Sequence, residues 1–172
     1  MGDLVYFSGR SLVGQRLGMR RGVPATAWYE RGCALELGDP VAAVEAYERA
    51  LAGRPDLADA HCNLGRLLHD DRRWTEAEGH YRLAICSDPA VALYWFNLGV
   101  VLEDQGRNAE AIAAYQQALA SPCDGSDTCM ADAHWNLARL LESAGRAADD
   151  DELVRSAVRH LLAYRSQMRR SG

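Results

Sequence analysis

Apolar and polar positions along this chain repeat every 34 residues. Residues 58–91 align with residues 92–125, and the amide, small and aromatic residues of the first stretch return at matching places in the second. The matching places are Asn63-Leu64-Gly65 and Asn97-Leu98-Gly99, Ala77 and Ala111, Tyr81 and Tyr115, and Ala84 and Ala118. A period of 34 residues is typical of a unit of two helices. We therefore predict helices at 58–70, 74–86, 92–104 and 108–120.

Less regular units flank these two. The first unit is predicted to hold helices at 26–37 and 40–52, because Gly38-Asp39 forms a turn and Pro40 suits a first helical turn. In the last unit, a helix around Trp135 is predicted to end before Ala144, and a second one to run from the acidic residues 149–152 to Met168. A polar loop is expected at 121–129. The predicted organisation is a poorly ordered leader at 1–25, units at 26–57, 58–91, 92–130 and 131–168, and a tail at 169–172.

Small residues mark the places where two helices of one unit cross closely. Helices pack at short range only where the facing side chains are small. The predicted contacts join Gly65, Gly99 and Ala138 on the first helices to Ala77, Ala111 and Ala157 on the second helices. The leucines and tyrosines beside them are expected to fill the core.

These residues carry a resemblance to a known family. Trp95-x2-Leu98-Gly99-x2-Leu102…Ala111-x3-Tyr115, and the copy that begins at His61, resemble the signature of tetratricopeptide repeat (TPR) proteins. The resemblance implies an all-α solenoid, a right-handed superhelix of about four antiparallel helical pairs. It further implies a scaffold or adaptor that binds a peptide or helix of a partner protein in the concave groove lined by the first helices.

Eight residues are expected in that groove: Asn63, Arg66, Phe96, Asn97, Val100, Trp135, Asn136 and Arg139. The three asparagines stand one to a unit, and an amide offers both a donor and an acceptor to a peptide backbone. This row resembles the asparagine ladder of some TPR arrays, although asparagine is also simply common at this place in the family. The two aromatic residues are expected to offer apolar pockets for partner side chains.

The charges of the chain restrict the class of partner that we expect. The chain has a net charge of −5, and all its basic residues besides histidine are arginines. In the predicted groove acidic residues outnumber Arg66 and Arg139, so a neutral or basic peptide is favoured over an acidic one. Nucleic acid is disfavoured as a partner. Two alternatives remain open: a scaffold that self-associates through its terminal units, and a regulator whose basic leader contacts nucleic acid.

Other chemistry finds little support in the sequence. No enzyme signature, cofactor motif or complete metal-ligand set is recognised, and His61 and His134 are interpreted as packing residues in places where the family often has tryptophan. A redox role of Cys123 and Cys129 is left open. Five scattered cysteines, together with the lack of a signal peptide or membrane span, favour a reducing cytoplasm. The abundance of arginine, alanine and glycine suggests a bacterial source.

Overall fold

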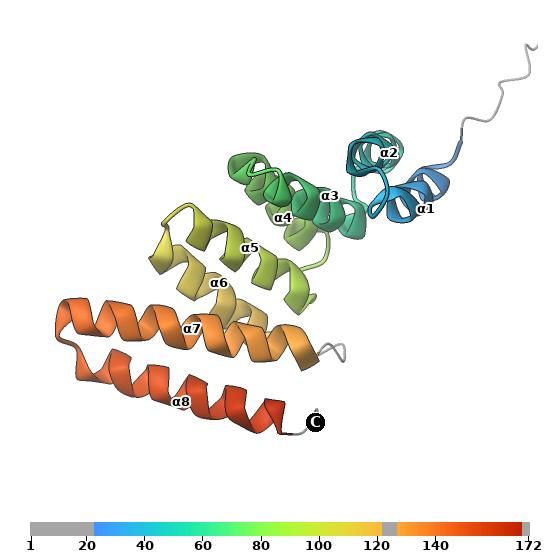
Figure 1. The fold of residues 1–172 in the computed structure, drawn as a ribbon. Helices are drawn as coiled ribbons and strands as arrows, with labels where there is room; N and C mark the ends of the chain where they lie inside the picture. Colours follow the sequence, from blue (N-terminus) through green and yellow to red (C-terminus); the bar gives the residue numbers. More distant parts are fainter. Residues whose placement is uncertain (1–22, 122–126, 170–172) are drawn as a thin grey trace, which may run out of the picture.

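Eight helices form the described part of the protein, which covers residues 23–121 and 127–169 of the computed structural model (Figure 1). There is no strand within these two ranges. The helices are α1 Ala25–Leu35, α2 Pro40–Gly53, α3 Ala58–Asp70, α4 Trp74–Ser87, α5 Ala92–Asp104, α6 Asn108–Ala120, α7 Asp127–Ala148 and α8 Asp151–Met168. None of them is both long enough and apolar enough to cross a lipid bilayer.

The helices form four pairs that stack in chain order. Each odd-numbered helix packs on the even-numbered helix that follows it, and each even-numbered helix then contacts the first helix of the next pair. Figure 1 shows the pairs following one another from blue to red, so that neighbours in the sequence are also neighbours in space. This architecture is an α-solenoid, as predicted, in which every unit is stabilised mainly by its neighbours.

The central helices lie where the repeat predicts them, but the last unit differs. α7 runs through Gly145 to Ala148, so the predicted end before Ala144 is wrong. Gly145 does not make a turn; it lets α8 approach, because a Cβ there would lie 2.9 Å from Cγ2 of Val154. The turn falls at Asp149, which has a positive φ of 53°. Asp150 then caps α8 by accepting hydrogen bonds from the backbone of the first turn.

The predicted loop at 121–129 is also shorter than expected. Residues 127–129 already belong to α7, while residues 122–126 lie outside the described part. Residues 1–22 of the predicted leader also lie outside the described part. The first helix, α1, begins at Ala25.

In the first three pairs, a glycine of the first helix faces a tyrosine ring of the second helix. A Cβ on Gly99 would lie 2.6 Å from Cε1 of Tyr115, and a Cβ on Gly65 would lie 2.9 Å from Cε1 of Tyr81. Gly32 and Tyr47 repeat the arrangement in the first pair, at 2.6 Å. For Gly65 and Gly99 the predicted partners were Ala77 and Ala111, but the atoms nearest to a Cβ on either glycine belong to the tyrosines one turn later. The alanines are buried, but the close approach belongs to the tyrosines.

The central crossing gives a test of this contact. Gly99→Ala is expected to destabilise the fold by about 1–3 kcal/mol, because the added methyl group overlaps the buried Tyr115 ring. Gly79→Ala is the matched control, since Gly79 lies within α4 with open space around it. This control should stabilise the fold by about 0.5–1 kcal/mol. Urea unfolding followed by circular dichroism measures both changes, and equal stability of the two variants would contradict the proposed contact.

Candidate functional site

The eight residues predicted for the groove all lie on the first helices of three successive pairs. Asn63 and Arg66 come from α3; Phe96, Asn97 and Val100 from α5; Trp135, Asn136 and Arg139 from α7. Trp135 and Arg139 are exposed and the other six are half-buried. They are thus accessible at least in part, and the contacts of each determine what it can offer to a ligand.

Each of the three asparagines reaches back to the preceding pair. The Nδ2 atoms of Asn63 and Asn136 donate to the hydroxyls of Tyr47 and Tyr115, both at 3.2 Å. Asn97 instead donates to Sγ of Cys62 at 3.4 Å. The asparagine row therefore connects neighbouring units, which is a structural role that the sequence did not reveal. The carbonyl oxygen of each amide remains for a ligand, whereas Nδ2 of Asn63 also lies 3.9 Å from Sγ of Cys33.

Both groove arginines are ion-paired with the preceding unit. Arg66 binds Glu36 at 2.5 Å, and Arg139 makes the equivalent contact with Glu103. The same carboxylates accept hydrogen bonds from the tyrosines that hold the asparagines, at 2.5 Å for Tyr47 and 3.3 Å for Tyr115. Burial, and then the nearby acidic groups, raise the pKa of both tyrosines, so their hydroxyls stay protonated. Tyrosine, carboxylate, arginine and asparagine form one linked cluster at each of these two junctions.

The junction between the second and third pairs is built differently. Val100 stands where the neighbouring units have Arg66 and Arg139, and His69 stands in the place of Glu103. His69 contacts Asp104 instead, with 2.6 Å between Nε2 and Oδ2. Burial raises the pKa of the Cys62 thiol to about 11, so this partner of Asn97 is uncharged. At this junction Val100 therefore places an apolar side chain where the other two have an arginine.

The two aromatic residues differ in accessibility. The Phe96 ring packs against Tyr115, with 5.7 Å between ring centroids, and contributes to the core. Trp135 packs on Tyr164 at 5.4 Å but leaves 48% of its surface exposed. Trp135 is therefore the better placed of the two to contact a partner.

A depression at the end of this face was not foreseen. It has a volume of about 570 Å³ between the first turn of α2 and the end of α3. Its lining combines apolar and charged side chains: Glu36, Leu37, Pro40, Val41, Val44, Arg66, Leu67, Asp70, Asp71 and Arg73. At the next junction Glu78 replaces Val44 and binds Arg107 at 2.6 Å and Gln105 at 2.9 Å. The apolar residues around the first turn, Leu37 and Val41, were the available signal in the sequence.

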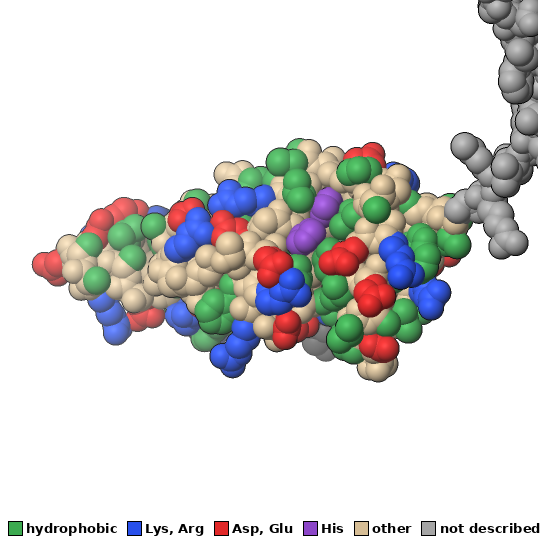
Figure 2. All heavy atoms as spheres, turned by 90° about the horizontal axis from the view of Figure 1, so that it is seen from above, with side chains coloured by type: hydrophobic (Ala, Val, Ile, Leu, Met, Phe, Trp, Pro, Cys, Tyr) green, Lys and Arg blue, Asp and Glu red, His purple; other side chains and the backbone are tan. Residues whose placement is uncertain are grey.

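Charged side chains on the surface are largely interleaved. Figure 2 shows acidic and basic groups side by side on one face of the molecule, with no broad patch of a single sign. Opposite charges are paired, for example, between Arg73 and Glu76 and between Arg82 and Glu78. No broad basic surface for nucleic acid is seen on this face.

Two histidine pairs lie inside the helical pairs, away from the groove. Nδ1 of His61 lies 3.0 Å from Nδ1 of His80, and the same atoms of His134 and His160 are 2.8 Å apart. Nε2 of His61 donates to the carbonyl of Pro55 at 3.1 Å, just as Nε1 of Trp95 donates to Pro89 at 3.0 Å. His61 thus takes the structural role of a tryptophan. The side chains of Cys123 and Cys129 lie outside the described part.

Comparison with known proteins agrees with this geometry. Two family models, both described as tetratricopeptide repeat, match residues 33–92 and 92–121, together just over half of the chain. No curated protein sequence matches the chain significantly. Among solved structures, a crystal structure of MamA has a TM-score of 0.73 at 18% identity, covering 86% of this chain and 80% of the other.

Further solved structures show the same fold. MamA from Desulfovibrio magneticus RS-1 (residue 41 to the end) has a TM-score of 0.67 at 22% identity and covers 84% of this chain and 76% of its own. The first TPR of Spaghetti (RPAP3), bound to the HSP90 peptide SRMEEVD, has a TM-score of 0.63 at 16% identity. It covers 70% of this chain and 93% of its own. At such identities the likeness establishes the fold alone.

Stacked antiparallel helical pairs, with first helices linked from unit to unit, define an α-solenoid repeat protein. The chain belongs to the tetratricopeptide repeat family. It is accordingly a protein–protein interaction module.

The histidine pairs generate a pH-dependent stability. Burial and then the neighbouring histidine lower the pKa of His80 and of His134, while burial and then Arg159 lower that of His160. Arg73 also lowers the pKa of His80, whereas Glu76 opposes the shift. The unfolded chain therefore takes up protons first as the pH falls below about 6.5, and the folded state loses stability.

A variant that copies the third unit isolates this effect. His61→Trp combined with His80→Ala reproduces Trp95 and its facing Ala114, and it removes one histidine pair. Melting temperatures between about pH 7.5 and pH 5.5 should then fall less than in the wild type, since few carboxylates titrate in this window. An unchanged pH dependence would show that this histidine pair does not control acid stability.

Proposed function

We propose that this protein binds an extended segment of a partner protein along the face formed by α3, α5 and α7. One observation carries the proposal: Asn63, Asn97 and Asn136 lie on three successive units, and each is oriented by a hydrogen bond to the unit before it. Amides held in this way lose little side-chain entropy when a ligand binds. Their free carbonyl oxygens can accept hydrogen bonds from the backbone N–H groups of a peptide of any sequence.

The charges of the face favour a neutral or basic segment over an acidic one. Arg66 and Arg139 are already neutralised by Glu36 and Glu103. An acidic ligand would have to break these ion pairs to reach the arginines. A basic ligand, in contrast, would be attracted by the carboxylates, which outnumber the arginines on this face. The interaction suits the cytoplasm, where Cys33, Cys62 and Cys86 would remain free thiols.

Apolar contacts would supply most of the remaining binding energy. Val100 lies between the two arginine clusters, and the depression near Leu37 and Val41 has the volume of a typical ligand pocket. Asp70 and Asp71 also line the depression. A segment with apolar side chains next to arginine or lysine fits this combination. The peptide complex of the RPAP3 repeat supports binding by this fold, although its peptide SRMEEVD is acidic.

A substitution in the middle of the face tests the proposal. Val100→Arg introduces the residue that both neighbouring units carry at the same place, so the fold should tolerate it. The added bulk and charge should weaken binding of a basic peptide, selected from a random library, by about tenfold or more. Leu83→Arg is the matched control, because Leu83 is exposed on α4 and Arg49 occupies its place in the first unit.

Fluorescence anisotropy with labelled peptides gives the dissociation constants of the three proteins. Wild type and Leu83→Arg should bind alike, and the peptide SRMEEVD should bind far more weakly than the selected peptide. Equal loss in both variants, or none in either, would place binding elsewhere. Preference for SRMEEVD would contradict the proposed partner charge, and a library that yields no binding peptide would contradict peptide recognition itself.

A further inference from the structure

The outer face of α8 lacks the cover that the other second helices have. α3 packs on α2, α5 on α4 and α7 on α6, and each is the first helix of a following pair. Among the described residues no helix follows α8 to cover it in the same way. The surface left open therefore has the shape that accepts an antiparallel helix.

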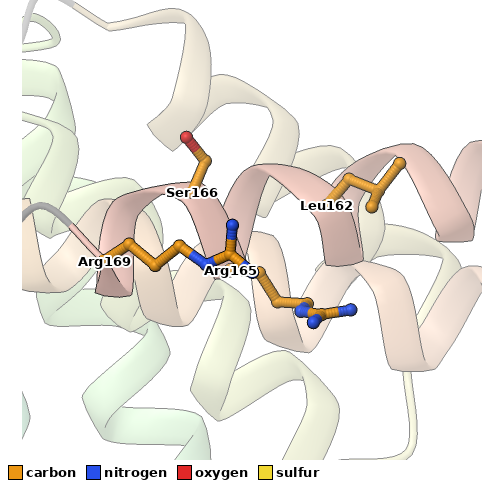
Figure 3. Close-up of a pocket in the computed structure, with 4 residues that line it drawn as sticks. All are labelled: Leu162, Arg165, Ser166 and Arg169. Atoms are coloured by element: carbon orange, nitrogen blue, oxygen red, sulfur yellow. The ribbon is translucent and has the colours of Figure 1, made fainter.

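The exposed side chains of α8 form an apolar and basic stripe. Val158 is 50% exposed, Leu162 59% and Met168 52%. Figure 3 shows Leu162, Arg165, Ser166 and Arg169 on this helix, where they line a depression of about 420 Å³. Residues 158, 162, 165 and 169 follow the four-three-four spacing of a helix–helix seam.

Two arginines of this stripe have no ion pair among the described residues. Arg155 and Arg159 are bound by Asp151 and Glu152, but Arg165 and Arg169 have no such partner within the described ranges. Arg165 stands in the place of three apolar residues that face the next unit elsewhere in the array, namely Leu51, Ile85 and Leu119. A surface that packs against this position would be complementary if it placed an acidic group opposite the arginine.

The opposite end of the array supplies a complementary surface. α1 has no preceding second helix in the described part, and Leu37 after its end is fully exposed. Glu30 occupies the place of Asn63, Asn97 and Asn136, the residues that contact the preceding unit elsewhere. Glu30 is exposed, and Arg31 beside it leans over the Trp28 ring, 5.4 Å from its centroid.

We propose that α1 of a second copy docks on α8, head to tail, in the place that a fifth pair would occupy. Antiparallel packing, as at the internal junctions, sets Val158 near Leu37 and brings Arg165 within reach of Glu30. Such a contact is heterologous, so each copy exposes a free end and further copies can add. This inference goes beyond the proposed groove and shares with it only Leu37, which lines the depression.

The end-to-end contact is weaker than an internal junction. Leu161 stands where Tyr47 and Tyr115 hold their asparagines, so the tyrosine–asparagine hydrogen bond is missing. Two separate chains also lose translational freedom when they associate. A reversible, concentration-dependent assembly follows from these two features.

Charge reversal at both ends tests the assembly in the full chain. Sedimentation velocity over micromolar to millimolar concentrations should show a mass that rises with concentration for the wild type. Arg165→Glu and Glu30→Arg should each weaken the association about tenfold or more. The association should return in the protein with both reversals, because Glu at 165 then faces Arg at 30. It should also return in an equimolar mixture of the two single variants, where each end meets an opposite charge on the other variant. Arg72→Glu is the matched control, since Arg72 is exposed in a turn away from both ends.

Several outcomes would overturn the proposal. A mass that stays monomeric at every concentration would do so, as would an association that neither reversal changes. A loss without recovery in the double variant and in the mixture would show that Arg165 and Glu30 do not meet. Binding of an acidic helical peptide to a monomeric wild type would assign the stripe to a foreign partner instead. None of these variants alters Asn97 or Val100, so groove binding and assembly succeed or fail independently.

Discussion

The close crossing of a glycine and a tyrosine inside each of the first three pairs is the contact on which much of this structure depends. Because Gly32, Gly65 and Gly99 lack a side chain, the tyrosine ring lies flush against the first helix. For Tyr47 and Tyr115 the hydroxyl then emerges at the junction with the next unit, where it orients an asparagine and contacts a carboxylate. Packing within a pair thus determines the polar groups between pairs, and these lie along the face formed by α3, α5 and α7.

Variation between the units changes the groove without changing the fold. At the first and third junctions a carboxylate of one unit pairs with an arginine of the next. At the second junction Val100 and the contact between His69 and Asp104 replace that pair. Each unit contacts mainly its neighbours, so a substitution at one junction leaves the others intact. This independence allows one backbone to present an apolar centre between two charged flanks.

The sequence predicted the regular helices well, because the two central units share glycine, alanine and tyrosine at a constant spacing. It failed at Gly145, since a glycine within a helix has the same sequence signature as a turn until its neighbour Val154 is known. The structural role of the asparagines was also invisible. Their partners Tyr47 and Tyr115 lie in other helices, and the first unit is one residue out of register with the rest. Glu36, the partner of Arg66, was missed for the same reason.

Polar residues at the two ends of the array differ from those inside it in a consistent way. Inside, an amide meets a tyrosine hydroxyl or the thiol of Cys62, and these neutral groups satisfy each other within one chain. At the ends Glu30 takes the place of the amide and Arg165 that of an apolar residue. Single charges keep a free end soluble, because an exposed row of leucines would associate without selectivity. Opposite charges at the two ends, however, make each end complementary to the other, so the feature that limits non-specific association also specifies one partner orientation.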